Sequence, residues 1–122
     1  MNVIWGSKFH PEFVAEFKAL PWEVRKELAA SVRYLVENGG PQLGSPQVDT
    51  LIGSKHANLK ELRFYVDDGV WRVAFAFDPK RNAIILVAGN KASVSEKRFY
   101  KDLIRLADMR YSDHLAQKQT EA

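Results

Sequence analysis

The apolar residues in the first third of the chain recur at the spacing of a helix. Pro11 stands where a proline is tolerated in a first helical turn, and Pro21 ends this pattern and can open a second helix. The second pattern stops at Asn38, Gly39 and Gly40, which are residue types that end helices. The sequence therefore predicts two successive helices that form a hairpin. Their apolar faces consist of Phe9, Phe13, Phe17 and Leu20 in the first helix and of Val24, Leu28, Val32, Leu35 and Val36 in the second.

The pattern then changes to that of β-structure. Residues 3–5 already form a short apolar run, which we interpret as a brief strand closed by Gly6. Residues 39–57 carry glycine and proline among polar residues without any period, so we expect a long connector there. Short turns separate the strand-like runs that follow, which implies an antiparallel meander. These runs lie at residues 59–66, 70–77 and 83–88.

A third helix is expected to begin near Val94, because Ser93 and Glu96 form a capping-box pair ahead of a broad apolar stripe. About ten residues at the end of the chain, rich in Gln, Lys and Thr, are expected to be disordered. A length of 122 residues fits one domain over residues 1–122. The sequence predicts an α+β fold in which an N-terminal helical hairpin packs on a small antiparallel β-sheet, followed by a C-terminal helix.

One face of the predicted sheet carries charge. Strand alternation places Glu61, Arg63 and Tyr65 on the same side of the first strand of the meander. A two-residue turn at residues 68–69 places Arg72 opposite Tyr65 and diagonal to Arg63, and a turn one residue earlier keeps the same parity. We expect no helix over this face, so the two guanidinium groups could bind a phosphate with forked bonds. The alternative is that both arginines only pair with Glu61 at the surface, as most strand arginines do.

Further cations lie near the ends of these elements. Lys91 follows the third run of the meander, and Lys97 and Arg98 lie early in the last helix, where positive charge opposes the helix dipole and so favours a polyanionic partner. Lys55 and His56 precede the first run, and we interpret the histidine as a surface residue rather than a base. The three histidines have no metal-binding spacing, so we expect neither a metal nor another cofactor.

Composition narrows the class of protein. The chain has no cysteine, which excludes disulfides and thiolate chemistry and suits a reducing compartment. No segment approaches the roughly 20 apolar residues of a membrane span, and the first eight residues do not form an export signal. The net charge of +3 permits polyanion binding without demonstrating it. We therefore expect a cytoplasmic protein with no membrane partner.

The order of the elements, together with two short segments, resembles the RelE/ParE superfamily of toxins from type II toxin–antitoxin systems. The segments are residues 59–63 (Leu-Lys-Glu-Leu-Arg) and 70–75 (Val-Trp-Arg-Val-Ala-Phe). Residues 89–115 are similar to the HigB-like, phage-derived branch. The matching pieces are Asn90-Lys91, residues 95–100, Leu103-Ile104, Ala107-Asp108 and His114-Leu115.

The resemblance implies a toxin that enters the ribosomal decoding site, cleaves messenger RNA without a metal and so inhibits translation. It implies as partners the ribosome, messenger RNA and a small antitoxin, often a helix-turn-helix protein. DNA would be contacted only through the antitoxin complex. The alternative within the superfamily is a ParE-like protein that inhibits DNA gyrase by binding, without RNA chemistry. A third possibility is a degenerate toxin that only binds its antitoxin.

Several site residues follow from the resemblance. Arg72 falls on the strand arginine that contacts the scissile phosphate, Arg63 and Glu61 fall on the preceding strand, and Lys91 lies near a basic position after the last strand. Tyr100 resembles a C-terminal tyrosine used by some members, although its place in an apolar stripe fits core packing equally well. Members often carry the catalytic acid at the end of the chain, and this chain continues past that point, which leaves the acid open.

The chemistry of such a site needs no metal. A ribose 2′-hydroxyl attacks the adjacent phosphorus, and the protein accepts its proton, stabilises the added charge and protonates the leaving oxygen. Arg72 and Arg63 suit the stabilising role, and Glu61 is the candidate base, with Lys91 or a ribosomal group completing the set. The residues expected to bind substrate are Lys55, Tyr65, Lys97 and Arg98.

Overall fold

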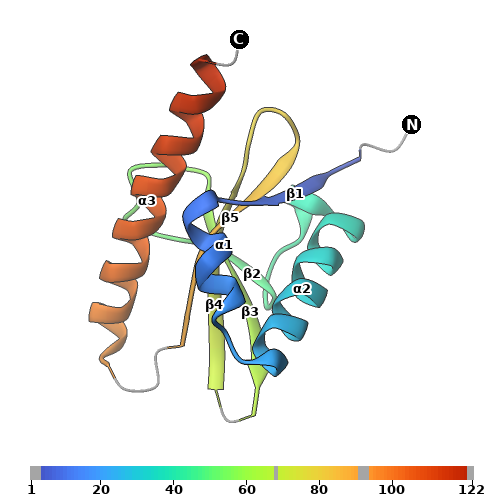
Figure 1. Ribbon diagram of the computed structural model, residues 1–122, viewed down its shortest axis with the longest axis vertical. Coiled ribbons are helices and arrows are strands. Elements are labelled where there is room, and N and C mark those ends of the chain that lie inside the picture. The colour runs from blue at the N-terminus through green and yellow to red at the C-terminus, as the bar shows by residue number, and fades with distance from the viewer. Residues whose placement is uncertain (1–3, 68, 91–93, 121–122) are drawn as a thin grey trace.

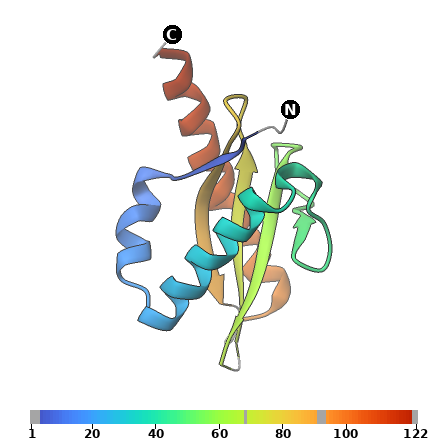
Figure 2. The ribbon, with the colours of Figure 1, turned by 90° about the vertical axis from the view of Figure 1, so that its right-hand side faces the viewer.

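The computed structural model describes residues 4–67, 69–90 and 94–120, with side chains as far as residue 117. Five strands form one sheet in the order β1-β5-β4-β3-β2, with helices on both of its faces (Figures 1 and 2). The predicted α+β class is confirmed. In chain order the elements are β1 (Gly6–Phe9), α1 (Pro11–Lys18), α2 (Trp22–Glu37), a 3₁₀ turn (Gly40–Gln42), β2 (Val48–Thr50), β3 (Leu59–Val66), β4 (Gly69–Phe77), β5 (Asn82–Asn90) and α3 (Glu96–Thr120).

Helices α1 and α2 cover one face of the sheet, as the helical period predicts. His10 caps α1, because its Nδ1 accepts a hydrogen bond from the backbone N–H of Glu12 at 3.1 Å, and Pro11 occupies the first turn. Both helices contribute to one core cluster with the sheet. Its large, deeply buried side chains are Phe13, Leu28, Leu35, Leu62, Val73, Phe75 and Ile85.

Helix α3 covers the opposite face, and the prediction that no helix covers the charged face is wrong. Leu103, Ala107 and Tyr111 of α3 are buried against this side of the sheet. The sheet presents the small residues Ala74 and Ala76 here, which lets a helix approach closely. Figure 2 shows α3 behind the sheet and α2 in front of it. The residues of the charged face therefore lie partly beneath a helix.

The meander has the predicted parity and the second of the two registers considered. Val66 pairs with Gly69, which is the register expected for the earlier of the two turn positions, and Asp67 adopts a positive φ of 53°. Arg63 consequently lies directly opposite Arg72, two positions from the register that a turn at residues 68–69 would give. The shift keeps both arginines on the same face.

The edges of the sheet differ from prediction. The first strand begins at Gly6 rather than occupying residues 3–5; residues 4 and 5 lie outside it, and residue 3 lies outside the described residues. It runs parallel to β5 with Gly6 beside Asn82, where a Cβ would lie 2.6 Å from the asparagine Oδ1. The expected connector contains the 3₁₀ turn and β2, which pairs with β3. Three residues are too few for an alternating pattern to be recognisable.

The cap and the end of α3 also differ from prediction. Ser95 caps the helix, since its Oγ accepts a hydrogen bond from the backbone N–H of Arg98 at 3.2 Å. Ser93, the predicted cap, lies outside the described residues. The helix continues to Thr120, through most of the segment for which we predicted disorder. That the chain forms a single domain stays a prediction.

Asp78 organises the turn between β4 and β5 and joins it to α3. Its Oδ1 accepts hydrogen bonds from the backbone N–H groups of Lys80 and Asn82, at 3.0 and 2.9 Å. Its Oδ2 lies 2.9 Å from His114 Nε2 of α3. Burial opposes ionisation of Asp78, but the hydrogen bond with His114 and those with the two backbone groups outweigh it, so its pKa lies below the ordinary value.

We expect Asp78→Asn to lower the free energy of unfolding at pH 7 by about 2 kcal/mol, because charge-assisted bonds are lost. Because the pKa of Asp78 is lower in the folded than in the unfolded state, its ionised form stabilises the fold at pH values above the unfolded-state pKa. This contribution disappears as the pH falls through the folded-state pKa. Urea unfolding at pH 7 and at about pH 2.5 measures the effect. A difference between wild type and variant that is equally large at both pH values would contradict this account.

Candidate functional site

Arg63 lies at the centre of a charged cluster between β2, β3 and α3. Its Nη2 is 2.5 Å from Glu61 Oε1, and its Nη1 is 2.8 Å from Asp49 Oδ2 on β2. Partial burial lowers the pKa of Arg63, but the two carboxylates outweigh it and raise the pKa above the ordinary value. In the free protein this guanidinium is held by two carboxylates that a phosphate would have to replace.

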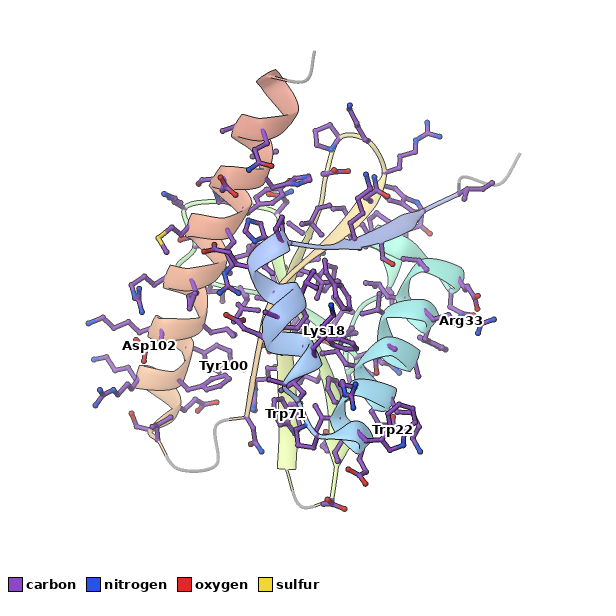
Figure 3. The ribbon with its side chains drawn as sticks, viewed as in Figure 1. Lys18, Trp22, Arg33, Trp71, Tyr100 and Asp102 are labelled. Atoms are coloured by element: carbon purple, nitrogen blue, oxygen red, sulfur yellow. The ribbon has the colours of Figure 1, made fainter. Side chains whose placement is uncertain are left out.

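Tyr100 brings α3 into the cluster. Its hydroxyl donates a hydrogen bond to Glu61 Oε1 at 3.1 Å. Figure 3 shows Tyr100 pointing from α3 toward the sheet, whereas Asp102 on the same helix points away. Burial and the adjacent Glu61 raise the pKa of Tyr100, so its phenol is protonated at neutral pH. The half-buried ring packs against the core cluster on this face of the sheet, and its hydroxyl places a proton donor on Glu61; a functional role for Tyr100 stays a prediction.

Arg72 is buried beneath the first turns of α3, with 8% of its surface exposed. Its guanidinium carbon lies 5.8 Å from the ring centre of Phe99 and 5.6 Å from that of Tyr100, which are cation–π distances. Its Nη1 lies 3.5 Å from the carbonyl oxygen of Val70, at the limit of a hydrogen bond. The open phosphate-binding surface expected for Arg72 is therefore absent from this arrangement.

The cluster contains charged atoms without partners. Within the described part of the chain, Glu61 Oε2, Arg63 Nε and Arg72 Nε are buried and form no hydrogen bond. Buried polar atoms are normally satisfied, so such a group points to a water or a ligand. A cleft of about 630 Å³ opens beside them; we call it the Glu61 cleft. Its lining consists of residues 49–52 together with Glu61, Arg63, Glu96 and Tyr100.

The structure brings some of the predicted substrate-binding residues to the neighbourhood of this cleft. Lys97 lines an adjoining groove together with Tyr100. The backbone N–H of Lys55 bonds to Asp108, which lines the same groove. Arg98 borders a separate hollow on the outer side of α3. Tyr65 is 71% exposed and lines neither the cleft nor the groove.

Other candidates fall outside the cluster. Lys91 lies outside the described residues. The ring of His56 contacts Ser112 Oγ at 2.9 Å and the edge of Tyr111, so it joins the loop before β3 to α3. Asp49 was missed because β2 was missed. Across residues 4–67, 69–90 and 94–120 no group of three or more His, Cys, Asp or Glu residues could hold a metal ion, and no helix is long and apolar enough to cross a membrane.

The architecture belongs to the RelE class of α+β folds. A free-state mutant of the Escherichia coli toxin RelE superposes with a TM-score of 0.57 over 84% of this chain and 95% of that chain, at 13% sequence identity. Residues 15–112 match the family described as phage derived protein Gp49-like, and the chain belongs to this family. The similarity to the HigB-like, phage-derived branch of RelE-type toxins is thereby confirmed.

Two proteins of Mycobacterium tuberculosis are similar in sequence. The one named "Putative toxin HigB2" is 46% identical over 92 residues, which make up 75% of this chain and 45% of that protein. The other, named "Putative toxin HigB3", is 45% identical over 82 residues, which make up 67% of this chain and 69% of that protein. The match thus spans less than half of the length of HigB2 but about two thirds of HigB3.

Proposed function

We propose that this protein is the toxin of a type II toxin–antitoxin module and that it cleaves messenger RNA on the ribosome. The observation that carries the proposal is the cluster of Glu61, Arg63 and Tyr100, with its unpartnered buried atoms beside an open cleft, in a chain of the Gp49-like family. The HigB relatives and the RelE-type fold support a toxin of this kind. Growth arrest on expression would follow from blocked translation.

The proposed reaction begins when the ribose 2′-hydroxyl attacks the neighbouring phosphorus. Glu61 accepts the 2′-hydroxyl proton as the O2′–P bond forms, and the P–O5′ bond breaks to leave a 2′,3′-cyclic phosphate. Tyr100 is neutral at physiological pH, as an ordinary tyrosine is, and burial and Glu61 raise its pKa further, so it carries a proton that it can give to the departing 5′-oxygen. Its existing hydrogen bond to Glu61 gives a route by which the proton returns from the carboxyl group to the phenol. No metal takes part in this scheme.

The arginines stabilise the negative charge that accumulates on the phosphate. Arg63 lines the cleft, and it binds the phosphate by exchanging one carboxylate partner for a phosphate oxygen. Arg72 lies beneath Tyr100 and acts from there through its charge. Lys91 remains the predicted further cation.

Replacing Arg72 by alanine tests the proposal. We expect Arg72→Ala to reduce cleavage on translating ribosomes about a hundredfold, because a buried charge that stabilises the transition state is lost. Primer extension on cellular messenger RNA measures the cleavage, and plate growth measures the arrest. Arg33→Ala is the control, because Arg33 lies exposed on α2 and, among the described residues, pairs with Glu37 alone. If Arg72→Ala leaves arrest and cleavage at full strength, the assignment of Arg72 is wrong.

The same samples separate this proposal from its rival. A ParE-like gyrase inhibitor would arrest growth and block DNA supercoiling while producing no new RNA ends. The proposal further includes an antitoxin, which we expect from a small adjacent reading frame encoding a helix-turn-helix protein. Its co-expression should relieve the arrest. Inhibited supercoiling together with intact messenger RNA would replace the endoribonuclease assignment.

A further inference from the structure

A second groove continues from the Glu61 cleft along α3. It has a volume of about 600 Å³, and Ile52 and Tyr100 line both hollows, so the two are contiguous. The wall contributed by α3 carries Lys97, Lys101 and Arg105. We call this hollow the basic groove. Of its three cations, only Lys97 was singled out from the sequence.

The three cations form a regular row. They are four residues apart on α3, so they lie on one face of the helix and rise by about 6 Å from one to the next. All three are exposed, and none forms an ion pair with a carboxylate in the described parts of the chain. By contrast, Arg63 and Arg110 are each held by carboxylates.

The acidic residues near the row do not neutralise it. Asp108, at the far end of the groove, bonds to Ser54 Oγ and to the backbone N–H of Lys55. Asp102 lines a separate hollow with Lys97 and Lys101, but among the described residues no ion pair joins it to either lysine. Like charges four residues apart destabilise a helix by about 0.2–0.5 kcal/mol per pair. The row therefore carries a cost in stability that binding of an anion would offset.

We propose that the basic groove binds the sugar–phosphate backbone of single-stranded RNA on one side of the cleavage point. This inference rests on the proposed function and adds Lys101 and Arg105 to the substrate-binding residues. A row of cations with a step of about 6 Å suits the phosphate repeat of an extended strand, and a basic groove beside an aromatic residue is the usual form of a single-strand site. The strand enters the Glu61 cleft past Tyr100 and Ile52.

The junction of the two hollows is suited to an unstacked base. Ile52 is 89% exposed, and it lies beside the half-buried ring of Tyr100 at the point where both hollows meet. When a base rests there, the phosphate on one side of its nucleotide faces the cations of the basic groove, and the phosphate on the other side faces Arg63. Contacts with phosphates hold the strand in register without selecting a sequence. The groove thus contributes affinity and position, and the Glu61 cleft contributes the chemistry.

The test compares two double variants with the same change in net charge. Lys101→Glu/Arg105→Glu alters the basic groove, whereas Lys18→Glu/Lys26→Glu alters exposed lysines on α1 and α2. The probe is a fluorescent single-stranded RNA with 2′-O-methyl riboses, which cannot be cleaved, and anisotropy with the full-length proteins gives Kd at several salt concentrations. We expect the groove variant to bind at least tenfold more weakly and its salt slope to fall by about 1.4, which corresponds to two phosphate contacts. The control should match wild type in its slope and lose less affinity.

Three results would overturn the inference. In the first, the groove variant binds both RNA and the antitoxin as wild type does. In the second, the two double variants lose the same affinity and the same salt slope. In the third, the groove variant binds RNA as wild type does but no longer binds the antitoxin. The last result would assign the groove to an acidic protein partner. Lys101→Ala/Arg105→Ala, with its melting temperature measured, repeats the comparison without introducing acidic groups. Cleavage by Arg72→Ala is scored separately, so a failure of the proposed function is distinct from a failure of the groove.

Discussion

Replacing Glu61 by glutamine is expected to lower the rate of messenger RNA cleavage about a thousandfold, because a positioned general base contributes between 10²- and 10⁴-fold. Glutamine keeps the shape of the side chain and can accept the hydrogen bond from Tyr100, but it cannot take the 2′-hydroxyl proton. Single-turnover cleavage on programmed ribosomes measures the chemical step directly. RNA binding in the anisotropy assay should remain close to that of wild type.

The fold should tolerate this change because Arg63 has a second carboxylate partner. Asp49 lies 2.8 Å from Arg63 Nη1, so we expect it to hold the guanidinium when Glu61 is neutralised. Asp49→Asn is therefore the matched control, since it removes one carboxylate from Arg63 but leaves the base in place. We expect its cleavage rate to stay within about tenfold of wild type. Equal losses in Glu61→Gln and Asp49→Asn would show that Glu61 acts only as a partner of Arg63.

The strand period was sufficient to predict which residues share the charged face. Glu61, Arg63 and Arg72 lie on one side of β3 and β4 in either of the two turn positions, because a shift of two residues preserves parity. The pairing of Arg63 with Arg72 depends instead on the turn. Nothing in the Asp67-Asp68-Gly69 sequence decides strongly between the two positions, since aspartate tolerates the positive φ that Asp67 adopts.

The sequence of β4 carries a pattern that predicts a helix over this face. Ala74 and Ala76 are apolar and fully buried, and such small residues on a strand are typical of a surface on which a helix packs. Strand β4 is buried on both faces from Arg72 to Ala76, which is the pattern of a central strand between two layers. This pattern predicts a helix on each face of the sheet. Because α1 and α2 form the hairpin on one face, α3 is the helix that remains for the other.

The rest of the candidate site depends on contacts that no local pattern encodes. Asp49 reaches Arg63 only because β2, a strand of three residues, pairs with β3. Tyr100 reaches Glu61 only because α3 packs on this face with Phe99 and Tyr100 over Arg72. Sequence supplied the types of residue on the sheet, whereas tertiary packing determines which of them can meet a substrate.

The largest effect on stability is expected for Phe75→Ala. Phe75 lies on the central strand β4, is completely buried, and contacts the edge of Phe77 with ring centres 5.4 Å apart. Removing its ring loses the transfer free energy and leaves a cavity that the helices α1 and α2 and the sheet can fill only in part. We expect the free energy of unfolding to fall by about 4 kcal/mol. Urea unfolding followed by tryptophan fluorescence measures the change.

A loss of this size is a large share of the roughly 5–15 kcal/mol that stabilises a typical domain. The matched control is Tyr65→Ala, which removes an exposed ring from the neighbouring strand β3 and should change stability by less than about 0.5 kcal/mol. Phe75→Leu should fall between the two, because it keeps most of the buried volume. If Phe75→Ala lowered the free energy of unfolding by less than about 1 kcal/mol, the helices would have to collapse into the cavity. Such a result would contradict a closely packed core around Phe75. Since Phe75 faces α1 and α2 while Glu61 faces α3, the folded fraction of the variant should still cleave RNA at the wild-type rate.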